Sequence, residues 1–426
     1  MMTAMSRGII LGVIADDFTG ATDVASMLVR AGMRTVQMIG VPAGRAPQAD
    51  AVVVALKTRT APVGQAVAES LAAWHWLQAA GARQCYFKYC STFDSTPQGN
   101  IGPVAQALMR ELGCDFSIAC PAFPENGRTV FRGHLFVGDQ LLSESGMREH
   151  PLTPMTDANL VRVLQQQTSL RVGLLRHDTV ARGAQAVRER FEALRGEGVS
   201  LAIADAVSND DLLVLGEACA ELPLVTAGSG VALGLPPAYA ARGWLEPDAR
   251  AAELPTVGGH AAVLSGSCSQ ATNGQVEHWL AQGRAAFRID PLMLAAGRDL
   301  AGEALAWAQA SLALGPVLVY ATSSPQAVRE VQAALGLERA GQLVEQALAR
   351  VARGLVDADV RRLVVAGGET SGAVVQALGV TQLRIGATID PGVPWTQVEG
   401  RELLLALKSG NFGGADFFGK ALAQVQ

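Results

Sequence analysis

The stretch GIILGVIADDFTGATDVAS, residues Gly8–Ser26, decides the fold prediction for this chain. Its first part, Gly8–Ala15, is a short apolar run rich in Ile and Val, and its length suits a strand buried on both faces. Two carboxylates, Asp16 and Asp17, end the run, and a Gly-containing, Ala-rich segment with helical character follows. A buried strand that turns directly into a helix predicts a parallel sheet, with both acids at its carboxyl edge. In open α/β sheets, ligands bind at that edge.

A simpler interpretation is that one polar side chain of this turn only caps the helix, a role that suits Asp17 or Thr19. A single cap accounts for one polar residue. It does not account for two adjacent acids together with Thr19, Thr22 and Asp23. The crowding of polar groups therefore favours a functional site over a cap alone.

The chain of 426 residues is long enough for two domains, or three, and its 49% hydrophobic residues can build sizeable cores. Apolar strands alternate with helical segments, which predicts α/β domains with parallel sheets. The segment 242–259 carries scattered charges with Pro and Gly residues, which is typical of a linker. We therefore place a domain boundary near residue 255, between residues 1–255 and residues 256–426.

Composition and charge exclude several function classes. The formal net charge is −5, whereas a nucleic-acid-binding surface needs a clustered basic face, so we expect no nucleic-acid partner. No stretch of about 18 residues is apolar and uncharged, so we expect no membrane partner. The cysteines are Cys85, Cys90, Cys114, Cys120, Cys219 and Cys268. Their spacing matches neither a zinc site nor a disulfide framework, which predicts buried thiols in a cytoplasmic protein.

Polar residues also follow two further predicted strands of the first domain. The strand AVVVAL runs into KTRT, which places Lys57 and Arg59 in the position that the two acids take after the first strand. The strand QCYFK runs into a loop whose Asp94, Ser95 and Asn100 can hydrogen-bond a polyhydroxylated ligand. An ordinary surface loop has a similar composition, so this segment alone favours a binding role only weakly.

Three predicted strands of the second domain each end in a loop rich in Ser and Gly. The loops are LSGSCS (264–269), GGETSG (367–372) and KSGNFGG (408–414). Free backbone N–H groups and the helix dipole favour phosphate binding at such loops. Close packing of helix on strand also uses Gly, but three such loops in one domain favour a nucleotide phosphate site.

Two other function classes stay open at this stage. An NAD-dependent sugar-acid dehydrogenase needs G-x-G-x-x-G after the first strand, where this chain instead has Asp16 and Asp17, which repel a pyrophosphate. A non-catalytic sugar-acid sensor has no use for three phosphate loops. The P-loop pattern, the protein-kinase signature, H-E-x-x-H and G-x-S-x-G do not occur in the sequence.

Six motifs between residues 14 and 414 resemble, in the expected order, those of the four-carbon acid sugar kinase family. They are IADDFTGATDVA, FDSTPQGNIGPV, PAFPENGRT, LSGSCS, GGETSG and KSGNFGG. The resemblance implies two Rossmann-like α/β domains with mainly parallel sheets and an interdomain cleft. Residues 1–255 would bind the sugar acid and residues 256–426 would bind ATP. A cytoplasmic phosphotransferase acting on an alcohol group is implied, and a homo-oligomer is compatible with the sequence.

The resemblance also implies the reaction, which is ATP-dependent phosphorylation of the C4 hydroxyl of a four-carbon acid, with Mg²⁺. The kinases of D-threonate and D-erythronate carry Leu-Arg where this chain has Pro97 and Gln98. That departure favours 3-oxo-tetronate as the substrate over D-threonate or D-erythronate. It leaves open which basic residue holds the substrate carboxylate.

An acid beside the accepting hydroxyl would orient it and take its proton, a role for which Asp17 is the first candidate and Asp94 the second. The resemblance implies that the substrate is bound by Asp16, Arg59, Ser95 and Asn100. It implies that ATP is bound by Ser265, Gly367, Gly368, Glu369, Thr370 and Gly410. We expect Arg59 to meet the substrate carboxylate as a planar fork. Glu369 is a candidate ligand of Mg²⁺, and the other metal ligands are unassigned.

Overall fold

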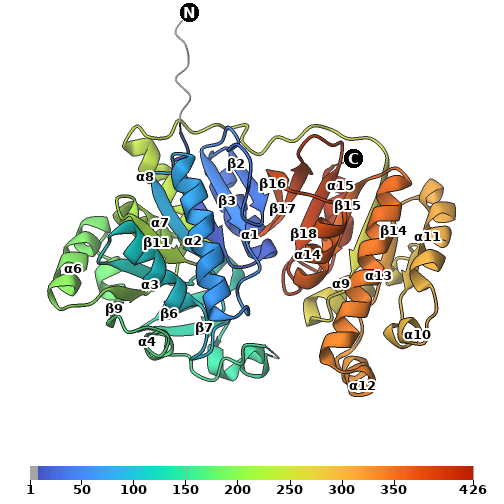
Figure 1. Cartoon of the computed structure of the whole chain (residues 1–426), viewed down its shortest axis with the longest axis horizontal. Coiled ribbons are helices and arrows are strands. Elements are labelled where there is room, and N and C mark those ends of the chain that lie inside the picture. Colours follow the sequence, from blue (N-terminus) through green and yellow to red (C-terminus); the bar gives the residue numbers. More distant parts are fainter. Residues whose placement is uncertain (1–7, 151, 426) are drawn as a thin grey trace, which may run out of the picture. The chain divides into compact units, whose positions relative to one another are not determined.

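A computed structural model describes residues 8–150 and 152–425 (Figure 1). These residues divide into two compact units between Ala252 and Glu253. We call the part up to Ala252 unit 1 and the part from Glu253 unit 2. Each unit is built on a sheet in which parallel strands predominate, with helices packed against it. The predicted α/β class with mainly parallel sheets is therefore confirmed.

The sheet of unit 1 is parallel throughout its described strand pairs. From one edge to the other it contains β2 (Thr35–Ile39), β3 (Ala51–Ala55), β1 (Leu11–Ala15), β4 (Gln84–Lys88), β11 (Leu224–Ala227), β5 (Ser117–Cys120), β10 (Leu201–Ala204) and β9 (Val172–Leu175). Every residue of β1 is buried. Because helices cover both faces of a parallel sheet, the sequence of its central strand is an unbroken apolar run.

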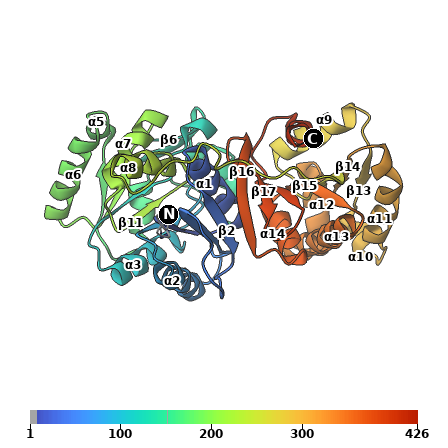
Figure 2. The same ribbon diagram turned by 90° about the horizontal axis from the view of Figure 1, so that it is seen from above.

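The helices of unit 1 lie on both faces of this sheet. They are α1 (Phe18–Arg30), α2 (Val63–Ala79), α3 (Ile101–Leu112), α4 (Leu160–Gln165), α5 (His177–Val180), α6 (Ala184–Gly196), α7 (Asn209–Cys219) and α8 (Leu235–Ala241). Figure 2 shows α1, α7 and α8 on one face and α2 and α3 on the other. The neighbouring strands β1 and β4 therefore lead to helices on opposite faces, which makes their carboxyl ends a topological switch point. A small antiparallel sheet of β6 (Arg128–Phe131), β7 (His134–Val137) and β8 (Gln140–Leu141) completes the unit.

The sheet of unit 2 contains, in order, β13 (Ala286–Arg288), β14 (Val317–Tyr320), β12 (His260–Ser265), β15 (Val360–Ala366), β18 (Leu404–Lys408), β17 (Val393–Val398) and β16 (Gln382–Asp390). The pairs β16–β17 and β17–β18 are antiparallel, and the other described pairs of this sheet are parallel. The helices are α9 (Gln270–Ala281), α10 (Pro291–Ala295), α11 (Leu300–Ser311), α12 (Pro325–Leu335), α13 (Leu337–Asp357), α14 (Gly368–Ala377) and α15 (Phe417–Gln424). In Figure 2, α9 and α15 lie on one face of the sheet, and α13 and α14 lie on the other. The ends of β12 and β15, which lead to α9 and α14, therefore form a second switch point.

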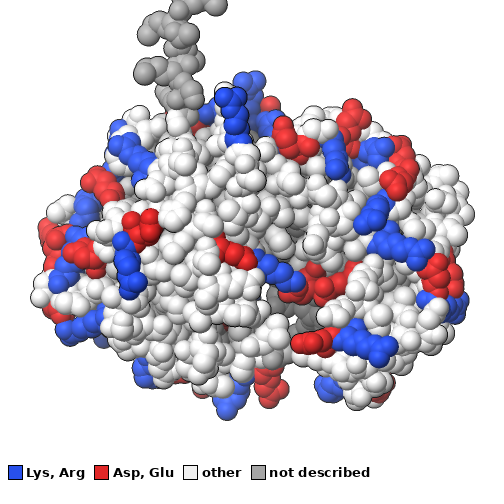
Figure 3. All heavy atoms as spheres, viewed as in Figure 1, with Lys and Arg blue, Asp and Glu red and all other residues white. Residues whose placement is uncertain are grey.

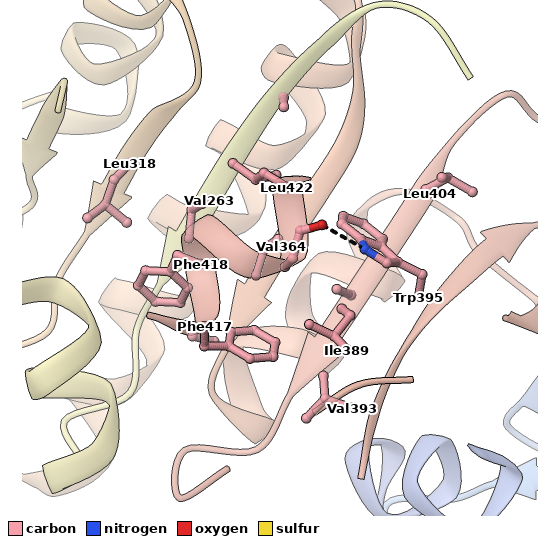
Figure 4. Close-up of a cluster of buried hydrophobic side chains, with 14 of the residues drawn as sticks. Val263, Leu318, Val364, Ile389, Val393, Trp395, Leu404, Phe417, Phe418 and Leu422 are labelled. Carbon is pink, nitrogen blue, oxygen red and sulfur yellow. Dashed lines mark hydrogen bonds between the residues drawn. The ribbon is translucent and has the colours of Figure 1, made fainter. Parts of the chain in front are cut away.

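A buried aromatic cluster holds α15 and α9 against the sheet of unit 2 (Figure 4). Trp395 of β17 is 1% exposed, and its indole N–H donates to the carbonyl oxygen of Ala421 in α15 at 3.0 Å. Phe418 packs edge-on against Trp279 of α9, with ring centroids 6.4 Å apart. Such buried aromatic groups supply much of the stability of a core. Since α15 directly follows the loop 408–414, the cluster also anchors that loop.

One face of the protein carries charges of both signs, and only some of the cysteines are buried. Basic and acidic side chains are interspersed on the face shown in Figure 3. The six cysteines are free thiols, of which Cys85, Cys120 and Cys219 are buried as expected, whereas Cys90, Cys114 and Cys268 are partly exposed. Within residues 8–150 and 152–425, none of the helices has the length and apolar character that crossing a membrane requires.

Candidate functional site

The first candidate site lies at the carboxyl edge of the unit 1 sheet, at the switch point between β1 and β4. Asp16 and Asp17 follow β1, Arg59 lies just beyond the end of β3, and Lys88 ends β4. Asp16 is 5% exposed and Lys88 is 2% exposed. Charged groups of both signs are therefore held at one largely buried place, which the sequence predicted for the two acids and the arginine.

Arg59 links three of the predicted carboxylates. Its Nε and Nη2 donate to the two oxygens of Asp16 at 2.9 and 2.8 Å, and Nη2 also donates to Oδ1 of Asp17 at 2.7 Å. Its Nη1 lies 3.5 Å from Oδ2 of Asp94. The planar fork expected for a substrate carboxylate is thus already occupied by Asp16. Nη1 is the guanidinium nitrogen with donor capacity left for a further acceptor.

Asp17 is both a helix cap and a partner of Arg59. It is the N-cap of α1, because its Oδ1 accepts from the N–H of Gly20 at 3.1 Å and its Oδ2 accepts from the hydroxyl of Thr19 at 2.9 Å. Burial favours the neutral acid, but the charges of Arg59 and Lys88 and these hydrogen bonds outweigh burial and lower the pKa of Asp17. Its carboxylate is therefore ionised at neutral pH and can accept a hydrogen bond from a hydroxyl. The cap interpretation holds for Asp17, but it does not account for the ion pair.

Two further acids near this edge have raised pKa values. Burial raises the pKa of Asp16, although Arg59 opposes the shift. Burial also raises the pKa of Asp23, in α1, to about 6, and Lys88 and Ser229 oppose that shift. The hydroxyl of Ser229 donates to Oδ2 of Asp23 at 2.5 Å. Because Ser229 follows β11, this bond fastens α1 to the next loop along the same edge.

Two residues expected to contact the substrate are engaged within the protein. The Nδ2 of Asn100 donates to the carbonyl oxygens of Thr58 and Ala61 at 2.8 and 2.9 Å. Asn100 thereby fixes the turn that contains Arg59. The hydroxyl of Ser95 accepts from the amide of Gln167 at 2.8 Å. Both residues position their neighbours, and their direct contact with a substrate stays a prediction.

The second candidate site lies at the carboxyl edge of the unit 2 sheet, where the three Ser/Gly loops follow the neighbouring strands β12, β15 and β18. These loops touch one another where only Gly fits. A Cβ on Gly410 would stand 2.5 Å from Oγ of Ser267, and a Cβ on Gly266 would overlap the hydroxyl of Thr370. The three loops therefore pack together at one edge.

The residues expected to bind ATP differ in their exposure. Gly367 precedes α14 with a φ of 126°, which only Gly adopts readily, and Gly368 and Glu369 are exposed in its first turn. The free N–H groups of this first turn suit an anion. Ser265 is fully buried, and its hydroxyl lies 2.6 Å from that of Thr322. Ser265 therefore ties β12 to the loop after β14.

Lys408, the last residue of β18, belongs to this edge and was not predicted from the sequence. Its side chain is fully buried, and its Nζ donates to the carbonyl oxygens of Ser409 and Gly410 at 2.8 and 3.0 Å and to the hydroxyl of Thr272 at 3.1 Å. Burial lowers the pKa of Lys408 to about 7. Lys408 thus fastens the loop 408–414 to the first turns of α9. A Lys directly after an apolar strand was the available signal, but it does not reveal that the side chain turns inward.

We expect Lys408 to make the free energy of unfolding rise between about pH 7 and about pH 10. The unfolded chain keeps the ordinary lysine pKa of about 10.4, so in this interval it binds a proton that the folded protein has lost, and raising the pH favours folding. Lys408→Met should remove this rise, which urea unfolding at several pH values would measure. Lys420→Met, at an exposed lysine, is the control. Parallel pH curves for the wild type and Lys408→Met would contradict the assignment.

A cavity of about 240 Å³ adjoins the loops of unit 2. Its apolar wall comes from α12 and α13 and contains Val328, Val331, Leu337, Ala340 and Val344. Its polar end is formed by Gly266, Cys268, Ser323, Glu369 and Thr370. Glu369 and Thr370 of the polar end were among the predicted site residues, whereas the apolar wall was not predicted. Its signal was the helical spacing of apolar residues over 325–357.

Two family models match the chain. The model of a sugar-binding N-terminal domain matches residues 11–235, and the model of a nucleotide-binding C-terminal domain matches residues 262–418. The first range contains Asp16, Asp17, Arg59 and Lys88, which we call the charged edge of unit 1. The second contains the Ser/Gly loops and the cavity of unit 2.

Curated relatives match over the full length. A 3-oxo-tetronate kinase from Cupriavidus necator is 65% identical, and the match covers 98% of this chain and 97% of that protein. A 3-oxo-tetronate kinase from Pseudomonas fluorescens is 64% identical, with 100% and 99% covered. A crystal structure from Salmonella typhimurium LT2 superposes with a TM-score of 0.87 at 45% identity, covering 98% of this chain and 99% of that one. The chain therefore belongs to the four-carbon acid sugar kinase family.

Proposed function

We propose that the protein transfers the γ-phosphoryl group of ATP to the C4 hydroxyl of 3-oxo-tetronate, in the breakdown of carbohydrate acids. The observation that carries this proposal is the 65% identity, over 98% of the chain, to the 3-oxo-tetronate kinase of Cupriavidus necator. The departure at Pro97 and Gln98 from the threonate and erythronate kinases points to the same branch. The reaction takes place in the cytoplasm, and a homo-oligomer is compatible with it.

The charged edge of unit 1 suits the sugar acid, so we assign its binding to residues 1–255. The carboxylates there are fixed by Arg59, and Nη1 of that guanidinium can donate to a ligand oxygen. Asp94 stands close enough to the same group to share in the contact. Ser95 and Asn100 complete the proposed site by holding its loops or by contacting the ligand.

The glycine-rich edge of unit 2 suits the nucleotide, so we assign ATP binding to residues 256–426. The apolar wall of the 240 Å³ cavity can take the base, because such pockets are mostly apolar with a few polar groups. The N–H groups of the loops at Gly367 and Gly410 can take the phosphates. Ser265, Gly368, Glu369 and Thr370 belong to the same proposed site.

In the proposed reaction, the oxygen of the C4 hydroxyl bonds to the γ-phosphorus, the bond to the β–γ bridging oxygen breaks, and ADP leaves. Asp17 orients the hydroxyl and receives its proton, which suits a carboxylate that is ionised at neutral pH. Mg²⁺ supplies neutralisation of the phosphate charges. Within the described residues, no group of three or more His, Cys, Asp or Glu is arranged to hold a metal ion. Glu369 is the protein residue that would hold Mg²⁺ in this proposal.

Product analysis tests the reaction class. After incubation with ATP–Mg²⁺ and 3-oxo-tetronate, NMR should show one phosphate on the C4 oxygen. ATP–Mg²⁺, but not NAD, should stabilise the protein against heat, by about 2.7 kcal/mol at a ligand concentration of about 100 Kd. Oxidation of a sugar acid with NAD and no phosphorylated product would contradict the proposal. D-threonate and D-erythronate are the alternative substrates within the family.

A further inference from the structure

Lys88 is a buried lysine at the centre of the charged edge of unit 1. It ends β4, where Ala15 of β1 and Ala227 of β11 flank it in register. Its side chain is 2% exposed. Among the residues that the structure describes, none makes a hydrogen bond or an ion pair with its Nζ. A buried polar group normally has a partner, so this nitrogen requires an explanation.

The Nζ of Lys88 lies at the start of α1, close to Gly20. A Cβ on Gly20 would stand 2.7 Å from Nζ and would overlap Oδ1 of Asp17. Both groups therefore lie against the same point at the start of α1. The positive charge of Lys88 lowers the pKa of Asp17, and it opposes the rise in the pKa of Asp23. These are interactions at a distance, because neither carboxylate forms an ion pair with Nζ.

Arg59 and Arg128 each make hydrogen bonds within the protein. The Nε and Nη2 of Arg59 donate hydrogen bonds to Asp16, and Nη2 also donates to Asp17. The Nη1 of Arg128 donates to the carbonyl oxygen of Asn126, whereas its Nε has no hydrogen-bond partner among the described residues. Lys88 thus places a positive charge at this edge, and the N–H donors of its ammonium group are not used within the protein.

We propose that Lys88 binds the carboxylate of the sugar acid and thereby selects acids over neutral sugars of the same size. An ammonium group on a nearly buried side chain is destabilising without a partner, and a bound carboxylate offsets this with a charge-assisted hydrogen bond. A four-carbon acid carries its carboxylate and its C4 hydroxyl at opposite ends. The proposal assigns the carboxylate to Lys88 and leaves the C4 hydroxyl to Asp17, whose Oδ1 lies near the same point at the start of α1. The inference rests on the proposed function and names the basic residue that the sequence left open.

The test compares two ligands that differ only at the carboxylate. Erythrulose has a CH2OH group where 3-oxo-tetronate has its carboxylate. Lys88→Met keeps the length of the side chain and removes its charge. We expect Lys88→Met to raise the KM and the Kd for 3-oxo-tetronate by about 10- to 100-fold, since hydrogen bonds to charged groups contribute about 1.5–3 kcal/mol. The inhibition constant of erythrulose should change by less than about threefold, and kcat should fall much less than KM rises.

Controls separate recognition from folding. Lys420→Met, at an exposed lysine of unit 2, should leave both ligands unaffected. Lys88→Arg should recover part of the preference for the acid if the larger group fits, and thermal unfolding reports whether each variant folds. Equal losses for both ligands, a fall in kcat alone, or an unchanged preference for 3-oxo-tetronate would each overturn the role of Lys88. If the wild type phosphorylates no four-carbon acid, the proposed function fails, and this inference fails with it.

Discussion

Replacing Asp17 with Asn should lower kcat by about 10²- to 10⁴-fold, the usual contribution of a positioned proton acceptor. The Asn side chain is nearly isosteric, and its oxygen can still accept from the N–H of Gly20 and from Arg59. Its NH2 group can donate to the hydroxyl of Thr19, so the cap of α1 is kept. The substitution therefore removes the negative charge and the proton-accepting oxygen with little change in local structure. Steady-state kinetics with saturating ATP and 3-oxo-tetronate would measure the effect.

The affinity for ATP provides the internal comparison. Because we assign the nucleotide to unit 2, Asp17→Asn should leave the Kd of ATP nearly unchanged. Asp50→Asn is the matched control, since Asp50 is a buried acid paired with Arg34 just before β3, at the opposite end of the strands. It should affect stability more than kcat. A kcat for Asp17→Asn within about threefold of the wild type would exclude Asp17 as the proton acceptor.

Replacing Arg59 with Met should lower the free energy of unfolding by about 3 kcal/mol. Removing one partner of a buried ion pair typically costs about 3–5 kcal/mol, and the 22% exposure of the Arg59 side chain places this site at the lower end. Without Arg59, the buried Asp16 and Asp17 lose their principal counter-charge. Their pKa values should rise, so the stability lost relative to the wild type should be smaller near pH 4 than near pH 7. Urea unfolding at both pH values would measure the difference.

Arg34→Met is the matched control for Arg59→Met. Arg34 pairs with one buried acid, Asp50, and its own side chain is 50% exposed, so its loss should cost about 1 kcal/mol or less. If both variants lose the same stability at neutral pH, then Arg59 is not the group that holds the charged edge together.

The parts of the fold that were predictable from sequence are those in which local pattern and tertiary environment agree. The run Leu11–Ala15 is apolar because the strand is buried on both faces, and the acids that follow it mark the end of the strand. The three Ser/Gly loops were predictable as a group, because each follows a strand of the same sheet. The pair β16 and β17 was not predicted, since nothing in the β-α alternation indicates an antiparallel hairpin between Gln382 and Val398.

The candidate site was predictable in its residue types and only partly in its geometry. The sequence placed Arg59 and the two acids at one edge, but it did not show that the guanidinium turns toward Asp16 and not toward a ligand. The contact of Asn100 with the substrate stays a prediction, but the sequence did not show that its amide holds a neighbouring turn. Lys408 was missed because inward burial of a lysine depends on oxygen atoms from α9 that are distant in sequence. Tertiary contacts determine which polar groups pair, and the spacing of residues in the sequence does not predict these pairs.

A coupled ADP-release assay with ATP–Mg²⁺ and a panel of four-carbon acids would identify the substrate of the protein. The panel contains 3-oxo-tetronate, generated in situ, together with D-threonate, D-erythronate and L-threonate. We predict turnover with 3-oxo-tetronate and a kcat/KM for it at least about 100-fold above that of the other acids. Turnover of a threonate or of D-erythronate, with 3-oxo-tetronate inactive, would contradict the proposed substrate.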